Sequence, residues 1–346
     1  MKKRIFYGVC MLGLVALVTT SCKKKEETTN SFGASHGTFQ VVNIDDDRAY
    51  LDPESYLTMW DEEDQIKVFN FEKGRQAVFQ MEEGGAGANE GNFINIDPSN
   101  NIGYASGYYA FYPAGMAASD FDGVYQKFTL DQVQYVRGLD NFTNTLQNIS
   151  IPQAAYTTYA DNHYNFNIIF GVANFKVKCS PKNGVTRYVK KLVVKDNHFN
   201  LWGEVTLKPN KIDSEKLTEM MGYLKAGNDT QYAQMWNDYV VSHDGEGLGY
   251  SAVGGGKELT YDFTAMNDGK GIALNGNDVK SLMVGLRPGA LAYGFTLDLY
   301  ILDGEETKVI TIDKYNYENR LFTIEPARFK NFGINSITDL VNNWQP

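Results

Sequence analysis

Short segments in which apolar and polar residues alternate recur along most of this 346-residue chain. Residues 65–71 read QIKVFNF and residues 77–81 read AVFQM, with a turn expected at Lys73 and Gly74. Alternation with a period of two places one face of a strand against a core and the other toward solvent. Clusters of Gly, Asn, Asp and Pro separate the segments. The pattern therefore predicts an all-β chain built of β-sandwiches.

The length suits two domains of ordinary size, and the boundary is expected near the IPQ segment at 151–153. A polar stretch follows it before dense strand patterns resume. We thus expect an N-terminal β-sandwich domain at 37–155 and a C-terminal one at 156–346. Within the second domain, residues at about 213–240 have helical spacing, which predicts a short helical insertion.

The first 21 residues have the layout of a secretory signal peptide. Lys2, Lys3 and Arg4 form a basic head, and the almost wholly apolar run 5–18 ends at small polar residues. This run is short for a membrane-spanning helix, which needs about 20 residues. Residues 1–21 are therefore expected to be removed on export.

Cys22 follows directly after this signal. A small residue before a cysteine at this place resembles the lipobox of bacterial lipoproteins, in which the cysteine carries diacylglycerol and becomes the mature N-terminus. The acidic pair Glu26 and Glu27 is similar to the surface-export signal of Bacteroidetes lipoproteins. The resemblance implies lipidation of Cys22 and a surface-exposed lipoprotein of the cell outer membrane. The polar residues 22–36 are expected to form a flexible tether.

Charge and cysteine content agree with an exported protein. Residues 1–21 carry three basic and no acidic residues, so their removal leaves 29 of the 32 Lys+Arg against 42 Asp+Glu, a formal net charge of −13. Such a chain repels nucleic acid, which excludes that class of partner. Cys10 leaves with the signal and Cys22 takes lipid, so Cys179 stands alone and no intrachain disulfide is expected.

The sequence predicts no catalytic, cofactor-binding or metal-binding residues. In the glycine run 254–256, Glu258 stands where a phosphate loop needs Ser or Thr for magnesium. No Gly-x-Ser-x-Gly nucleophile motif is present. The acidic stretches 45–47 and 267–278 lack the ligand spacing of a calcium loop. Four histidines lack the spacing of a metal site and are expected on the surface or in loops: His36, His163, His198 and His243. We therefore expect a protein that is not an enzyme and uses no cofactor.

Several segments occur in the order found in one protein family. The chain resembles the Bacteroidetes fimbrillins, the subunits of type V fimbriae, over most of its mature length. The segments that carry the resemblance are WDEEDQIKVF at 60–69, YYAFYP at 108–113, IPQ at 151–153, the strands at 170–177 and 189–194, and LRPG at 286–289.

This resemblance implies two transthyretin-like Greek-key β-sandwich domains and a structural or adhesive subunit of the fimbrium. In this family an arginine-specific protease removes the first strand, and a strand donated by another fimbrial subunit fills the emptied groove. The matching pieces here are a first strand at 38–44 and a processing site between Arg48 and Ala49. A plain turn is the alternative interpretation of Arg48.

The C-terminus leaves a stalk, tip, accessory or anchor position open. A donor strand should alternate, yet residues 333–341 do so poorly, and Pro326 cuts off the cleaner stretch 320–324. A tip or accessory subunit would accept a strand without donating one. An anchor subunit would instead keep its lipid.

A surface glycan-binding lipoprotein of a polysaccharide-utilisation system is the alternative function. It shares the signal, the tether and the sandwich architecture, and the 22 tyrosines offer rings that stack on sugars. An exposed flat aromatic platform would favour glycan binding, whereas a removable first strand over an apolar groove would favour the fimbrial subunit. A host protein or glycan is the further class of partner under either function.

Overall fold

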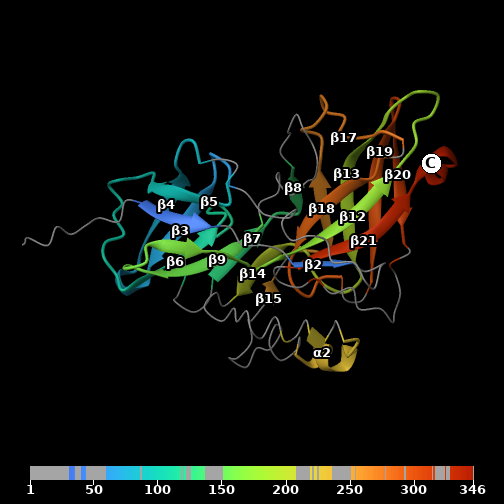
Figure 1. Cartoon of the computed structure of the whole chain (residues 1–346). Helices are drawn as coiled ribbons and strands as arrows, with labels where there is room; N and C mark the ends of the chain where they lie inside the picture. The colour runs from blue at the N-terminus through green and yellow to red at the C-terminus, as the bar shows by residue number, and fades with distance from the viewer. Residues whose placement is uncertain are drawn as a thin grey trace, which may run out of the picture.

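The computed structural model describes residues 31–35, 40–43, 60–85, 88–117, 119, 121, 126–136, 151–207, 219, 222–223, 226–235, 251–253, 255–276, 278–291, 294–313, 315, 324 and 328–345. These residues form four sheets with few helical turns, and two separate hydrophobic cores lie among them. Figure 1 shows β3 to β6 in one group of strands, and β12, β13 and β18 to β21 in another. The all-β sandwich class predicted from the sequence is confirmed.

The first group is an eight-stranded sheet in the order β10-β1-β5-β4-β3-β6-β9-β11. Because β10 also lies beside β9, the sheet curls around its own core. In chain order its strands are β1 (Ser31–Ser35), β3 (Gln65–Asn70), β4 (Arg75–Met81), β5 (Glu90–Asn95), β6 (Gly107–Tyr112), β9 (Gln153–Thr158), β10 (His163–Asn165) and β11 (Asn167–Ile168).

The alternating pattern of the sequence decides which side chains fill this core. In β4, Ala77, Phe79 and Met81 are buried, whereas the residues between them are half-buried. The 3-10 turn η2 (Phe71–Lys73) joins β3 to β4, and Gly74 ends it with a φ of 60°. Glycine adopts this left-handed conformation without the steric cost that a side chain adds.

The second group is a sandwich of two sheets. One has the order β18-β12-β21-β2 and the other β20-β19-β13-β16-β8, with β17 also paired to β13. Phe175, Phe295 and Phe332 meet between the two sheets with ring centroids 4.9 to 5.6 Å apart. The strands are β2 (Gln40–Asn43), β8 (Val133–Tyr135), β12 (Gly171–Lys178), β13 (Arg187–Asp196), β16 (Glu258–Asp262), β17 (Ile272–Leu274), β18 (Lys280–Leu286), β19 (Phe295–Asp303), β20 (Glu306–Ile312) and β21 (Arg328–Ser336).

A small three-stranded sheet and two short helices complete the described elements. The sheet has the order β15-β14-β7, from β7 (Gln126–Leu130), β14 (Gly203–Leu207) and β15 (Ser251–Val253). Helix α2 (Asp229–Met235) lies within residues 213–240, the stretch with helical spacing. Helix α3 (Thr338–Asn342) follows β21 directly. Among the residues that the structure describes, no helix is long and apolar enough to span a bilayer.

β1 lies inside the predicted tether, and β9 lies across the predicted domain boundary. Residues 31–35, expected within the flexible tether 22–36, form β1 because Phe32 and Ala34 alternate into the first core. The predicted boundary at 155/156 cuts through β9, which pairs with β6 along its whole length. β2 lies within the strand expected at 38–44, but it pairs with β21 in the second group and not in the first.

Truncating a buried side chain in the core of the second group should lower the free energy of unfolding far more than truncating an exposed one on the same strand. We expect Phe332→Ala to lower the free energy of unfolding by about 4 kcal/mol, because it leaves a cavity between the two sheets. Ile334 lies on the same strand but is 51% exposed. Ile334→Ala should therefore cost less than about 1 kcal/mol. Urea denaturation of both variants measures the difference, and equal losses would contradict this account of the core.

Candidate strand-exchange site

The first described strand, β1, is inserted between two neighbours. It runs antiparallel to β5, with Phe32 opposite Phe93, and parallel to β10, with Gly33 opposite His163. Its backbone groups therefore pair on both sides, and Gly33 N also donates a hydrogen bond to the Asn162 carbonyl at 3.2 Å. A strand in this position is part of the sheet and of its core.

Phe32 is the anchor of β1. Its side chain is 1% exposed and meets the rings of Phe79, Tyr108 and Tyr164 at centroid distances of 5.2, 5.4 and 5.0 Å. Burying one such side chain contributes about 1.5–3 kcal/mol. The core of the first group is thus closed by a residue that precedes every other part of that core in the chain.

Trp60 fixes the other end of β1. Its indole N–H donates a hydrogen bond to the Ala34 carbonyl at 3.2 Å. The indole packs edge-on against Phe93, Tyr112 and Phe166 at 4.7 to 5.8 Å. The tryptophan that opens the WDEEDQIKVF segment is therefore a direct contact of the first strand.

Tyr164 lies under Phe32 with its hydroxyl buried. Among the described residues this hydroxyl has no hydrogen-bond partner. Burial raises the pKa of Tyr164 well above its ordinary value, and the neighbouring Tyr108 adds to the rise. The ring therefore stays neutral and serves as one wall of an apolar site.

The same N-terminal stretch also reaches the second group. Residues 31–43, called the leader segment below, contain both β1 and β2. β2 pairs parallel to β21 at the edge of its sheet, with Gln40 opposite Arg328 and Asn43 opposite Asn331. Figure 1 shows β2 alongside β21, away from β3 to β6. One short stretch of chain thus supplies strands to two sheets with separate cores.

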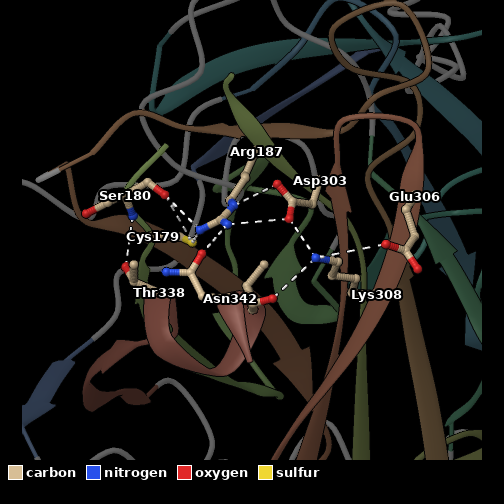
Figure 2. A network of polar contacts seen from close by, with 9 residues as sticks. Cys179, Ser180, Arg187, Asp303, Glu306, Lys308, Thr338 and Asn342 are labelled. Atoms are coloured by element: carbon tan, nitrogen blue, oxygen red, sulfur yellow. Dashed lines mark hydrogen bonds and ion pairs between the residues drawn. The ribbon is translucent and has the colours of Figure 1, made fainter. Parts of the chain in front are cut away.

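The C-terminal end of the chain is held by a network of polar contacts. Figure 2 shows Arg187 at its centre, with Asp303 and Lys308 on one side and the start of α3 on the other. Arg187 Nε donates to Asp303 Oδ1 at 2.9 Å, and Arg187 Nη2 donates to Asn342 Oδ1 at 2.6 Å. Lys308 Nζ reaches Asp303 Oδ2 at 2.7 Å and the Val341 carbonyl at 3.3 Å.

This network ties α3 to the strands on which it packs. Ser180 N donates to Thr338 Oγ1 at 2.9 Å, so both ends of the helix are bonded. Hydrogen bonding from Arg187 lowers the pKa of Asp303, and Lys308 lowers it further, whereas burial opposes the shift. Ile337 and Val341 are buried in the second core. The C-terminal residues 333–341, which alternate poorly for a donor strand, are therefore packed into the second group.

The site residues predicted from the sequence lie outside the described residues. This holds for Cys22, Arg48 and Ala49, so their roles stay predictions. The sequence predicts His163 on the surface or in a loop, but the structure places it on β10, half-buried beside β1. The sequence missed β1 altogether, although Phe32 and Ala34 stand two apart and gave a short alternating signal. Among the described residues no group of three His, Cys, Asp or Glu side chains is placed to hold a metal ion.

Comparison with known proteins gives structural neighbours at low identity. No protein-family model and no curated protein matches the chain. Among solved structures, the chain is similar to a candidate cell adhesion protein from Bacteroides ovatus, with 14% identity, 89% of this chain and 92% of that chain covered, and a TM-score of 0.43. A candidate cell adhesion protein from Bacteroides uniformis gives 10% identity, 88% and 94% coverage, and a TM-score of 0.44. A fimbrial assembly protein from Parabacteroides distasonis gives 12% identity, 89% and 92% coverage, and a TM-score of 0.31.

The network around Arg187 should make stability depend on pH in the acid range. A carboxyl whose pKa is lowered by folding contributes stability above its ordinary pKa, near 4, and loses it as the pH falls through the folded value. We expect Asp303→Asn to lower the free energy of unfolding by about 3 kcal/mol at pH 7. The difference in the free energy of unfolding between this variant and the unchanged protein should shrink as the pH falls below about 4.

Asp278 supplies the matched control, because its carboxyl is exposed and lies 4.0 Å from Lys280. Asp278→Asn should change the free energy of unfolding by less than about 0.5 kcal/mol. Urea denaturation at a series of pH values measures both variants. A cost of Asp303→Asn that stays constant from neutral to acid pH would contradict the charged network.

Proposed function

We propose that this chain is a structural or adhesive subunit of type V fimbriae, exported as a lipoprotein through Cys22 and assembled by replacement of its first strand. Other fimbrial subunits are its partners, by donation of a β-strand. Its location is the outer membrane before processing and the fimbrium afterwards. The names of the structural neighbours agree with this function, but the support comes from the leader segment.

The observation that carries the proposal is the position of β1. It is short, lies near the N-terminus and fills the space between β5 and β10 with a buried aromatic side chain. Loss of β1 would leave unpaired backbone groups on both neighbours and an open space beside Tyr108 and Tyr164. An edge of this kind readily pairs with another strand.

The proposed processing site lies beyond both strands of the leader segment. A cut between Arg48 and Ala49 would separate β1 and β2 from the rest of the chain together. The first group would lose its anchor at Phe32, and β21 would lose β2, one of its two parallel neighbours. One cleavage would thus open an acceptor position in each group.

The C-terminal contacts favour an accepting role over a donating one. To leave as a donor, residues 328–342 would have to break the pairing of β21 with β12 and the hydrogen bonds of Arg187 and Lys308 to α3. They would also expose Phe332, Ile337 and Val341. Among the positions that the sequence left open, a tip or accessory subunit fits these contacts best.

Cleavage at Arg48 is tested by a change that keeps the charge. In the native bacterium, Arg48→Lys should prevent formation of the species that begins at Ala49, because an arginine-specific protease needs the guanidinium. N-terminal mass spectrometry of membranes and of sheared filaments, taken separately, identifies the first residue of each form. We expect a diacylated Cys22 start in membranes and an Ala49 start in filaments of the unchanged protein.

Arg75→Lys is the matched control, because Arg75 is exposed at the start of β4. It should leave both N-termini as in the unchanged protein. If the unchanged protein shows only the diacylated Cys22 start, confined to membranes, it is not a polymerising subunit. An N-terminus at Cys22 that carries no lipid would contradict the proposed lipid anchor.

The aromatic residues on the outer face of β6 and β9 favour glycan binding as the second candidate function. Tyr156 is 51% exposed, and its ring lies 4.9 Å from Tyr109. A Cβ added at Gly107 would lie 2.1 Å from the Tyr156 hydroxyl oxygen, so the phenol lies across the backbone of β6. Phe121 continues this surface, at 5.0 Å from Tyr109 and 6.3 Å from Phe71. Rings supported by a strand in this way present apolar bodies with polar tips.

Replacing Tyr156 separates this second function from the first. On an array of surface and dietary polysaccharides, Tyr156→Ala should lower the affinity for any glycan that binds by about tenfold. Tyr135→Ala is the control, because Tyr135 is 76% exposed and lies on β8. Absence of glycan binding by the unchanged protein, or equal loss in both variants, would exclude this surface as a sugar platform.

A further inference from the structure

We propose that the space filled by β1 selects the donated strand by a three-residue pattern: a large aromatic residue, then glycine, then a small residue. These positions correspond to Phe32, Gly33 and Ala34. The inference rests on the proposed strand exchange and goes beyond it, because it states which partner strands fit this chain.

The aromatic position follows from the surroundings of Phe32. Phe79, Tyr108 and Tyr164 face its ring from different elements, β4, β6 and β10. Tyr164 is fully buried, and its ring forms one wall of the site that holds the Phe32 ring. A smaller residue in this place would leave a void, since the interior around it is close-packed.

The glycine position follows from His163. A Cβ built on Gly33 would lie 2.7 Å from His163 Nδ1, 3.5 Å from Cε1 and 3.7 Å from Cγ. All three atoms belong to the imidazole ring on the paired strand β10. The φ of Gly33 is not in the left-handed region, so the requirement comes from this close approach and not from the backbone conformation. Any side chain here must displace the imidazole ring.

The small position follows from the surroundings of Ala34. Its side chain is fully buried, and its carbonyl accepts the Trp60 indole N–H. Opposite Ala34 stands Gly91, where an added Cβ would lie 2.0 Å from Met81 Cε and 3.5 Å from Trp60 Cδ1. Trp60 and Met81 thus occupy the space that glycine leaves on β5. A larger residue at position 34 would force these side chains apart, which is costly in a packed interior.

A second segment of the same chain matches the pattern at only two positions. Phe332, Gly333 and Ile334 stand in β21 with the same spacing, but the third residue is the branched Ile334. By the selection proposed here, β21 of a second copy that has been cut after Arg48 is a poor donor to the first. The preferred donor is a strand of another subunit that carries a small residue at the third position.

Peptide exchange on the full mature chain tests the selection. The Cys22→Ser chain is cut after Arg48 with an arginine-specific protease, and the uptake of a fluorescent peptide of residues 31–43 is measured by anisotropy. Unlabelled peptides then compete with it. Relative to the native peptide, we expect Phe32→Ala to compete about 100-fold less well and Gly33→Ala about tenfold less well. Ser31 is exposed, so Ser31→Ala should compete as well as the native peptide.

A change in the protein distinguishes contact with His163 from a general effect on the peptide. In the His163→Ala chain, the Gly33→Ala peptide should compete within about twofold of the native one, because the clash is gone. A peptide of residues 331–343 should compete poorly with the cut native chain, and Ile334→Ala in that peptide should improve it.

The outcomes separate the inference from the function on which it rests. If the cut chain takes up no native peptide, strand exchange itself is wrong, and the selection falls with it. If it takes up the native, Gly33→Ala and Phe32→Ala peptides alike, strand exchange stands and the selection is wrong. A Gly33→Ala defect that persists in the His163→Ala chain would overturn the role of the imidazole ring.

Discussion

The packing of Phe32 among the rings of the first core is the contact on which this end of the molecule depends. The core is assembled from strands between Trp60 and Ile168, yet one of its central side chains comes from residues 31–35. Backbone pairing on both sides of β1 and the hydrogen bond from Trp60 hold that side chain in place. This insertion joins β10 to β5 in the eight-stranded sheet.

Different kinds of interaction hold the N-terminal strands and the C-terminal helix. β1 is held by the apolar contacts of Phe32 and by backbone pairing, and β2 pairs with β21, so another strand of suitable shape can reproduce these contacts. The C-terminal helix is held by named side chains, with Arg187 and Lys308 both bonded to Asp303. Contacts of the first kind are replaceable by another chain, whereas contacts of the second kind belong to this sequence alone. This asymmetry is why the N-terminal end is proposed as the exchangeable one.

Alternation in the sequence was enough to predict the strands and the sandwich class, because period-two burial is a local property, as β4 illustrates. It did not predict which strands pair, since pairing between residues far apart in the sequence does not alter the local pattern of apolar and polar residues. β1 was lost in the tether because Phe32 is its only large apolar residue. β2 was assigned to the wrong sheet because its pairing with β21 spans almost the full chain. The closeness of His163 to Gly33 depends on that same long-range register, so the sequence gives no sign of it.

The position of β21 affects when its sheet can form. This strand lies between β12 and β2, parallel to both, and residues 44–327 separate it from β2 in the chain. Its sheet therefore cannot close until β21 has left the ribosome. Pairing over such sequence distances is slow, because the entropy of closing long loops is lost before the contacts form. A chain built in this way keeps this sheet incomplete while the residues between β2 and β21 are being made.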